Sequence, residues 1–309
     1  MTVKPPIPPQ LGILVGVLAA SSASIFIRYA LEEAPPLVIA ALRLSLATAV
    51  LLPLVLARRR AELRSLARSE LRLALLSGLL LGVHFATWIT SLAYTSVASS
   101  VVLVSTSPLI VGLLSPALLG EPLTRRFLAG LSAALAGLVL VGLSDACTLS
   151  SGLDCPALAE FVQGRAFAGD LLAFAGALAG AGYFMLGRRL RPRLSLEVYI
   201  FIAYGTAAIF LLASTLVTGG RLAGYSAKIY LWIALLALLP QLVGHTAFNW
   251  ALRYMPATYV TLTTLGEPIG SAALAAVLLQ EVPPPARLLG GACILLGILI
   301  ASRQVRVAK

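Results

Sequence analysis

Long apolar runs, separated by short polar stretches, follow one another along the whole chain. A membrane-spanning helix needs about 20 predominantly apolar residues, and only helices and closed barrels can span lipid. The runs are unbroken and lack the alternation of barrel strands, so each one predicts a helix. We expect ten spans, at Leu11–Ala30, Pro36–Ala57, Leu71–Ala93, Val97–Leu119, Phe127–Ser144, Asp170–Leu186, Leu196–Val217, Ile229–Ala251, Thr258–Leu279 and Ala286–Ala301.

The composition agrees with this pattern. Of the 309 residues, 59% are hydrophobic and only 11% are charged, whereas about a quarter of an average soluble domain is charged. A soluble enzyme, a disordered scaffold and a nucleic-acid-binding module are therefore excluded. We expect an all-α integral membrane protein that contacts the lipid bilayer and no nucleic acid.

The net charge of +11 reflects where Lys and Arg lie in the loops. If the N-terminus is cytoplasmic, the basic clusters Arg58–Arg60, Arg125–Arg126 and Arg188–Arg193 all fall on the cytoplasmic side. Cytoplasmic loops of membrane proteins carry an excess of Lys and Arg. The sequence therefore predicts a multi-pass protein of the cell (inner) membrane with both termini in the cytoplasm.

The two halves of the chain resemble each other when one is shifted by about 160 residues, a comparison that detects internal repeats. Each half would hold five spans, and an odd number makes the second copy enter the membrane from the opposite side. We predict two inverted five-helix repeats, residues 1–144 and 170–309, joined by an external loop of residues 145–169. The pairs in register include Tyr94 and Tyr254, Pro108 and Pro268, Glu121 and Glu281, Gly130 and Gly290, and Gly137 and Gly297.

Each predicted half ends with an apolar run, a Glu, a short loop and a last helix with spaced glycines. These motifs resemble the EamA branch of the drug/metabolite transporter superfamily over nearly the whole chain. The outer loop departs from that pattern, because it is longer than expected and carries two Cys. The residues that carry the resemblance are Leu118–Pro122 with Gly130 and Gly137, Leu278–Glu281 with Gly290 and Gly297, Ser91–Thr95, Ala251–Ala257, Arg43 and Glu267–Pro268.

The resemblance implies a ten-helix carrier that works by alternating access around a central mid-membrane cavity. Its substrates would be small metabolites such as amino acids, or toxic compounds, and it would often act as an exporter. A membrane channel and a membrane-embedded enzyme with a lipid-soluble substrate are the alternatives. The sequence has no filter-like loop, no zinc-peptidase motif and no paired acid and base, so we expect neither of these, and no cofactor.

Two ionisable side chains lie deep within predicted spans, where such groups usually face a cavity. At about 1.5 Å per residue, Arg43 lies roughly 10 Å below the outer surface and Glu267 roughly 15 Å above the inner one. We predict that both bind substrate, as a pair or as two groups facing one cavity. A structural ion pair, or an Arg43 that extends to the outer surface, would explain them without a substrate.

Further polar and aromatic side chains share helix faces inside the spans. His84 and Trp88 lie one turn apart, as do Gln241, His245 and Asn249. A polar stripe facing lipid would be costly, so we expect these residues to face protein or substrate, with Tyr183 completing the site. Hydrogen-bonded packing is the alternative for each. The two His lie on separate helices without a nearby acid, so we expect no metal site.

Pro108 and Pro268 fall in the middle of the fourth and ninth spans. A proline removes a backbone donor and loosens the helix, and paired breaks near mid-membrane are typical of transporter hinges. Glu267 precedes the second break, and its repeat mate is Ser107. This asymmetric carboxylate makes protons the candidate coupling ion.

The long outer loop carries Cys147 and Cys155. An exterior loop is an oxidising setting in most bacteria, so we predict a disulfide between them, with two free thiols as the alternative. Cys293 lies within the tenth predicted span and is expected to stay reduced.

Overall fold

The computed structural model describes residues 5–95, 97–146, 164–278, 280 and 285–302, and all regular elements in these ranges are helical. Eight helical segments within them are long and apolar enough to cross a membrane. The other two expected spans coincide in position with α8 (Arg125–Ala146) and α16 (Pro285–Ser302), which fall outside that set. Ten spans therefore stay a prediction. The eight segments are Pro9–Ala30, Pro36–Arg58, Arg68–Ser91, Ser100–Leu118, Arg165–Leu190, Leu196–Val217, Ala227–Ala251 and Ala257–Leu278.

Prolines and short polar caps set several helix ends. Pro36 occupies the first turn of α3, where the helix needs no N–H from it. Pro256 lies directly before α14, as its N-cap residue. Ser195 caps α11 by accepting a hydrogen bond from the Val198 N–H. The helices before the central loop are α1 (Pro9–Ser21), α2 (Ala23–Ala30), α3 (Pro36–Arg58), α4 (Arg60–Arg64), α5 (Arg68–Ser91), α6 (Val97–Val104), α7 (Ser107–Leu118) and α8.

The second half contains the interruptions that matter most for the site. Its elements are α10 (Gly164–Leu190), α11 (Leu196–Val217), α12 (Ala227–Leu236), the π-helix η1 (Ala237–His245), α13 (Thr246–Ala251), α14 (Ala257–Thr263), the 3₁₀ turn η2 (Thr264–Gly266), α15 (Glu267–Leu278) and α16.

Both expected proline breaks coincide with interruptions of a helix. Pro108 lies in the first turn of α7, just after the gap that follows α6. Pro268 is the second residue of α15, after the 3₁₀ turn η2. The expected span Ile229–Ala251 lies within the apolar segment Ala227–Ala251, in which residues Ala237–His245 form a π-helix. Pro240 within it has no N–H to donate, and such wide turns accommodate a missing donor and occur frequently at functional sites.

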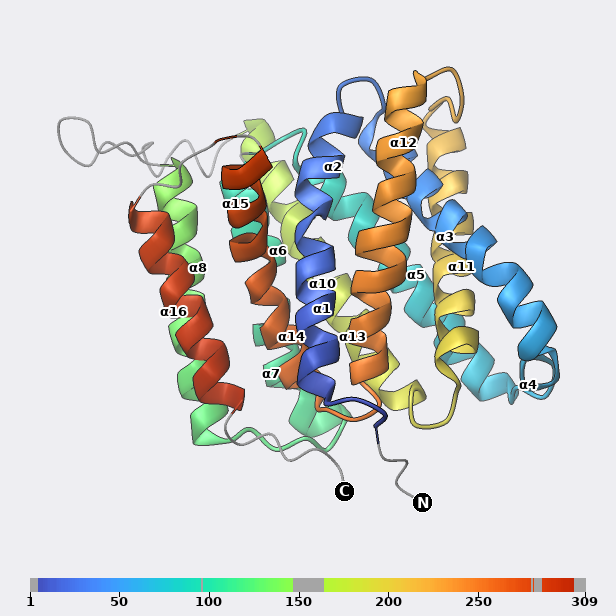
Figure 1. Cartoon of the computed structure of the whole chain (residues 1–309), viewed down its shortest axis with the longest axis horizontal. Helices are drawn as coiled ribbons and strands as arrows, with labels where there is room; N and C mark the ends of the chain where they lie inside the picture. Colours follow the sequence, from blue (N-terminus) through green and yellow to red (C-terminus); the bar gives the residue numbers. More distant parts are fainter. Residues whose placement is uncertain (1–4, 96, 147–163, 279, 281–284, 303–309) are drawn as a thin grey trace.

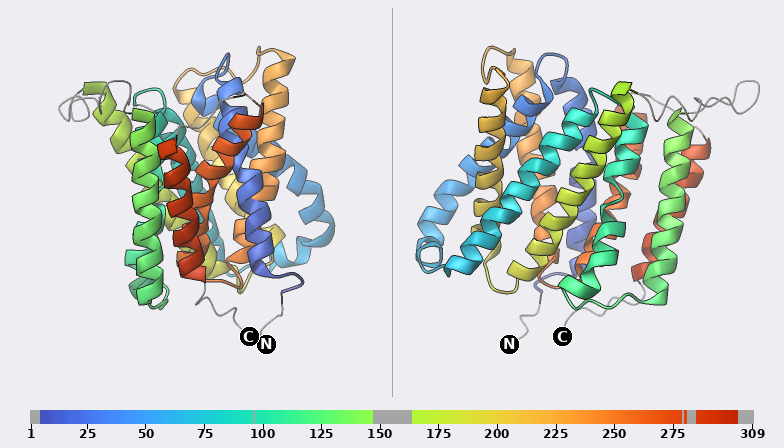
Figure 2. Two further views of the ribbon diagram at one scale, coloured as in Figure 1. Left: turned by 60° about the vertical axis from the view of Figure 1, so that its left-hand side comes forward. Right: turned by 180° about the vertical axis from the view of Figure 1, so that it is seen from behind.

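The helices form one bundle in which segments distant in sequence lie side by side. Helices α8 and α16 run side by side at the left-hand edge of the bundle in Figure 1. Helix α1 lies beside η1 and α13 near the middle of the bundle. Seen from behind, α10 runs alongside α5 (Figure 2). The start of α1 and the end of α16 are at the same end of the bundle (Figure 1).

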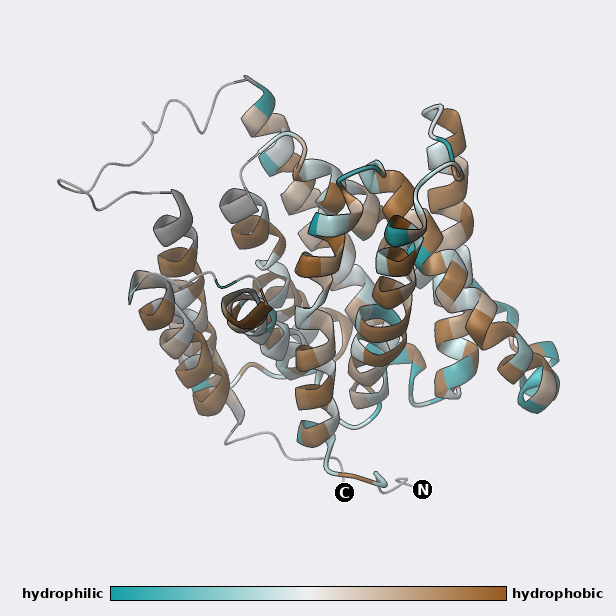
Figure 3. Cartoon of the chain, turned by 45° about the horizontal axis from the view of Figure 1, so that its top comes forward, coloured by the Kyte–Doolittle hydropathy of each residue, from teal (hydrophilic) through white to brown (hydrophobic). Residues whose placement is uncertain are grey.

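Many large apolar side chains of the described residues are exposed, and α8 and α16 are coloured mostly as hydrophobic in Figure 3. Examples are Leu113, Ile209 and Leu288, which are 67%, 71% and 61% exposed. Exposed apolar area on this scale marks a surface that something other than water covers. The long apolar helices make this surface the one that contacts lipid.

Glycines bring some of these helices into backbone contact. A Cβ at Gly137 would lie 2.4 Å from the Gly290 carbonyl oxygen, and one at Gly130 would lie 2.5 Å from the Gly297 oxygen. Small residues permit such close approach in lipid, where van der Waals packing drives helix association. The α8–α16 contact therefore depends on these four glycines.

Candidate functional site

Arg43 is the most deeply buried charged side chain of α3, with 1% of its surface exposed. It lies on the inner face of this helix, beside Ile39 and Leu44, both of which are fully buried. Its guanidinium carbon lies 4.4 Å from the centre of the Phe85 ring on α5, in a cation–π contact. Its Nε and Nη1 atoms have no hydrogen-bond partner. Burying a guanidinium whose donors have no partner costs free energy. Such unpartnered donors are expected in a binding site, where a ligand supplies the missing acceptors.

Glu267, the first residue of α15, is only half-buried. Its charge interacts with that of Arg43, but no ion pair within 4.0 Å joins these two described residues. The helix dipole of α15 favours a carboxylate at this end. The Glu267 carboxylate therefore acts on Arg43 without making the direct contact of a structural ion pair.

His84 and Trp88 are neighbours on α5, and their rings stack with centroids 5.9 Å apart. The His84 Nδ1 atom lies 2.8 Å from the Gly176 carbonyl oxygen of α10. Because a carbonyl only accepts, Nδ1 carries the proton and donates it. The Trp88 Nε1 donor is buried without a partner.

The π-helix and α13 contribute three polar side chains. Gln241 is fully buried, and neither its Oε1 nor its Nε2 has a partner. The Nδ1 of His245 and the Oδ1 of Asn249 are also buried and unpartnered. The Asn249 amide nitrogen donates to the Tyr183 hydroxyl at 2.6 Å and to the His245 carbonyl at 2.7 Å. Tyr183 thus enters the site through a hydrogen bond to Asn249.

Ring contacts and charges connect these groups. The Phe85 ring, which lies under Arg43, also meets the His245 ring at 5.5 Å between centroids. The charge of Arg43 acts on His84 and His245 as well as on Glu267. We call this set the central polar cluster; its members are Arg43, His84, Trp88, Tyr183, Gln241, His245, Asn249 and Glu267.

Sequence reasoning missed two members of the surroundings. Phe85 looks like an ordinary core residue, and only the tertiary contact places it between Arg43 and His245. Tyr204 on α11 is fully buried, and its hydroxyl lies 3.2 Å from Thr246 Oγ1. The position of Tyr204 in the middle of a span could have indicated a buried polar contact. Nothing in the sequence indicates which residue its hydroxyl contacts.

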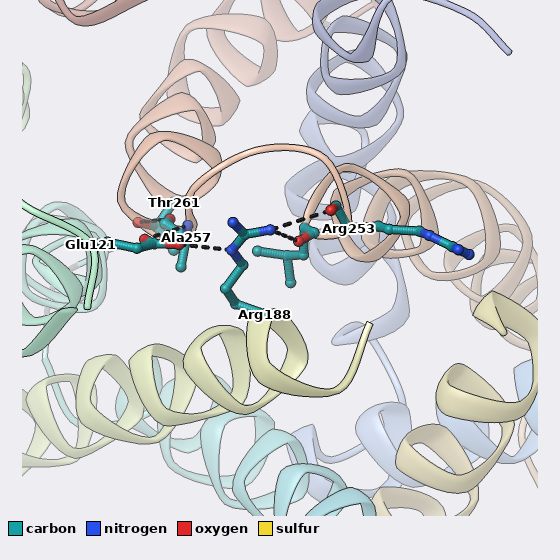
Figure 4. Close-up of polar contacts among 6 residues, drawn as sticks. Glu121, Arg188, Arg253, Ala257 and Thr261 are labelled. Atoms are coloured by element: carbon teal, nitrogen blue, oxygen red, sulfur yellow. Dashed lines mark hydrogen bonds and ion pairs between the residues drawn. The ribbon is translucent and has the colours of Figure 1, made fainter. Parts of the chain in front are cut away.

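A second polar assembly lies at the end of the bundle where α1 begins (Figures 1 and 4). Arg188, near the end of α10, donates from Nε to Glu121 Oε1 at 2.7 Å and from Nη1 to the Leu252 oxygen at 2.7 Å. The other Glu121 oxygen accepts the Ala257 N–H at 3.0 Å. Both side chains are largely buried. We call this the Glu121–Arg188 network. The sequence motif Leu118–Pro122 had indicated that Glu121 is important. Arg188 was noted only as part of a basic cluster in a cytoplasmic loop.

Neither a metal centre nor the predicted disulfide can be built from the described residues. These residues contain no group of three or more His, Cys, Asp or Glu side chains able to hold a metal ion. Cys147 and Cys155 lie outside them. Cys293 on α16 has a free thiol.

Long apolar helices around a buried polar cluster define a multi-pass membrane protein. The model of the EamA-like transporter family matches residues 8–143 and 167–303, so the chain belongs to this family. It is a membrane transporter of the drug/metabolite kind. The resemblance seen in the sequence is thereby confirmed.

Similar proteins agree with this assignment. An uncharacterized transporter, YyaM, of Bacillus subtilis (strain 168) is 24% identical and covers 87% of this chain and 85% of its own length. An uncharacterized transporter of Archaeoglobus fulgidus is 26% identical, over 91% and 92%. A solved crystal structure of a protein has the same fold, with a TM-score of 0.75 at 21% identity over 95% of this chain and 97% of its own.

Proposed function

We propose that this protein is a secondary active transporter that moves small molecules by alternating access around the central polar cluster. One observation carries the proposal: α3, α5 and η1–α13 each bring buried, unpartnered polar atoms to the cluster, and Arg43 and His245 both contact the Phe85 ring. A folded protein seldom leaves such groups without partners. A substrate with polar groups of its own would satisfy them, and the eight members of the cluster are its proposed binding residues.

Repeated contacts support the inverted five-helix repeats, residues 1–144 and 170–309. Gly16 of α1 packs against Phe248, and Gly176 of α10 packs against Trp88. The second pair is the first one moved by about 160 residues, with the roles of the two halves exchanged. Two halves related in this way can exchange conformations, which supplies two states of nearly equal energy that open to opposite sides.

The finer features belong to the same proposal. Pro108 and Pro268, where helices are interrupted, are its hinges, and protons bound at Glu267 are its coupling ion. The protein would lie in the inner membrane with both termini in the cytoplasm, and it would export small metabolites such as amino acids, or toxic compounds. A channel or an enzyme would be an outcome that contradicts this function.

Counterflow in proteoliposomes tests the proposal. Amino acids, nucleosides, sugars and cationic drugs are first screened by the thermal shift of the purified protein, since a ligand of the folded state raises its stability. Proteoliposomes loaded with an unlabelled ligand should then accumulate the labelled compound transiently. The variant Arg43→Gln should lose this exchange, while Arg221→Gln, in an exposed loop, should keep it. Ion conductance without exchange, or a chemically altered ligand, would refute the carrier.

A further inference from the structure

The charges of the central polar cluster restrict what can bind there. Arg43 stays protonated at all physiological pH values, and Glu267 is the one carboxylate whose charge acts on it among the described residues. A positive charge in a low-dielectric interior needs a counter-anion. Without a ligand, Glu267 is the group available for that role, although it forms no direct ion pair.

The other ionisable groups nearby do not take this role. His84 on α5 and His245 on η1 carry no negative charge in any form, and Tyr204 on α11 is a weak acid. Around Glu267, α15 packs on α1, which has no ionisable side chain, and on α2, which carries Arg28 and Tyr29. The turn η2 contacts α1, α14, α15 and α16, and of these α14 carries Tyr259 and α16 carries Cys293.

Four of the seven unpartnered atoms of the cluster are hydrogen-bond donors, whereas Gln241 Oε1 and Asn249 Oδ1 are acceptors and the role of His245 Nδ1 depends on its tautomer. Arg43 offers Nε and Nη1, Trp88 offers Nε1, and Gln241 offers Nε2. A carboxylate has two oxygens that only accept, so it can accept hydrogen bonds from such donors. The rings of Phe85 and Trp88 lie beside these donors and would contact an apolar or aromatic body attached to the carboxylate.

We propose that the cluster binds a monocarboxylate anion with an apolar or aromatic body at Arg43, and that Glu267 takes up one proton as the anion binds. This proposal rests on the transport function above and names its substrate class. Two carboxylates facing one guanidinium would leave an uncompensated negative charge in the membrane. Protonation of Glu267 restores neutrality, so anion and proton bind and move together. No bond is formed or broken apart from the transfer of this proton from water to the Glu267 carboxylate.

Matched pairs of small compounds test the substrate class. The purified protein is heated with benzoate, phenylacetate or butyrate, and separately with benzamide, phenylacetamide or butyramide at the same concentration. The carboxylates should raise the melting temperature, with an apparent affinity at least about tenfold above that of the amides, a difference of about 1.4 kcal/mol. Equal shifts for acids and amides, or no shift with any acid, would overturn the proposal.

Proton uptake tests the coupling without any variant. At pH 8 in weak buffer, mixing the wild-type protein with benzoate should remove about one proton from solution for each anion bound, as linkage requires when a group is protonated on binding. The variant Glu267→Gln should bind benzoate and take up none. A zwitterion such as phenylalanine that binds without proton uptake, while benzoate does not bind, would show that Glu267 holds an ammonium group and would contradict the proposal.

Variants of Arg43 complete the test. Arg43→Gln should abolish the shift caused by benzoate, whereas Arg59→Gln, which removes an equal charge from an exposed ion pair with Glu197, should leave it unchanged. If Arg43→Gln does not fold, Arg43→Lys keeps the charge but not the fork, and it should weaken binding of benzoate several-fold. Wild-type binding in either variant would overturn the role of Arg43. Counterflow of a neutral or cationic compound would refute the anion specificity while leaving the transport function intact.

Discussion

Arg188 and Glu121 form an ion pair of 2.7 Å, and together they hold both sides of the turn that joins α13 to α14. Arg188 donates to the carbonyl groups that directly follow α13, those of Leu252 at 2.7 Å and Arg253 at 3.3 Å. Glu121 accepts the first N–H of α14, at Ala257. Helix ends leave such groups without intrahelical partners. The pair therefore connects α10 and the loop after α7 to the turn before α14, the helix that precedes η2 and α15 (Figure 4).

Removing the charge of Glu121 should destabilise this end of the bundle. Glu121→Gln leaves Arg188 partly buried without its counter-ion, and we expect a loss of about 1–3 kcal/mol in the free energy of unfolding. Glu32→Gln is the matched control, because its ion pair with Lys228 is about half exposed and such pairs contribute about 0–1 kcal/mol. Thermal unfolding of both variants in detergent measures the difference. Equal effects would show that the Glu121–Arg188 network is no stronger than a surface pair.

The contact between α8 and α16 should not tolerate a side chain at its glycines. Gly137→Ala places a methyl group 2.4 Å from the Gly290 oxygen, so the helices must separate, at a cost of about 1–3 kcal/mol. Gly205→Ala on α11 is the control, since the nearest atom to its new methyl group would be 3.5 Å away. Thermal unfolding compares the two. A Gly137→Ala protein as stable as wild type would contradict this packing.

Glu33 should make one loop contact depend on pH. Hydrogen bonds from the Ser226 N–H at 2.9 Å and its hydroxyl at 2.7 Å lower the pKa of the Glu33 carboxyl below its usual range. A lowered carboxyl pKa means that the stabilisation is fully present above the unfolded-state value and is lost as the pH falls through the folded-state value. Hydrogen–deuterium exchange should therefore show protection of the Ser226 amide at pH 6 that decreases below about pH 4.

The variant Glu33→Gln is the control for this contact. It cannot ionise, so protection of the Ser226 amide should no longer change between pH 6 and pH 3.5. A wild-type protein whose protection is equally independent of pH would show that the Glu33 carboxylate does not hold this loop in solution.

Membrane orientation can be tested by labelling single cysteines in a protein whose three native cysteines are replaced. A cysteine at position 60, the first residue of α4, should react with an impermeant maleimide only after the cells are opened. One at position 221, in the loop before α12, should react from outside intact cells. The expectation follows from the excess of Lys and Arg on the cytoplasmic side. External labelling at position 60 would reverse the orientation.

The sequence alone identified eight of the ten expected spans, together with their punctuation and the chemistry-bearing residues. Apolar runs of spanning length must become helices in lipid, and a proline such as Pro36 or Pro256 is favoured at the start of a helix or just before it. This reasoning depends on local properties of the chain. It therefore selected Arg43, Gln241, Asn249 and Glu267 as unusual, because a polar side chain in an apolar run is visible without knowledge of its neighbours.

Only the tertiary structure decided what these residues contact. No local rule indicates that Phe85 lies beneath Arg43, that Tyr183 accepts from Asn249, or that Arg188 reaches Glu121. The π-helix at Ala237–His245 has a local cause in Pro240, yet a proline alone is compatible with a kink, a break or a widened turn. The partners come from helices far apart in sequence, and their approach is set by packing of the whole bundle, with glycines such as Gly137 fixing the closest distances.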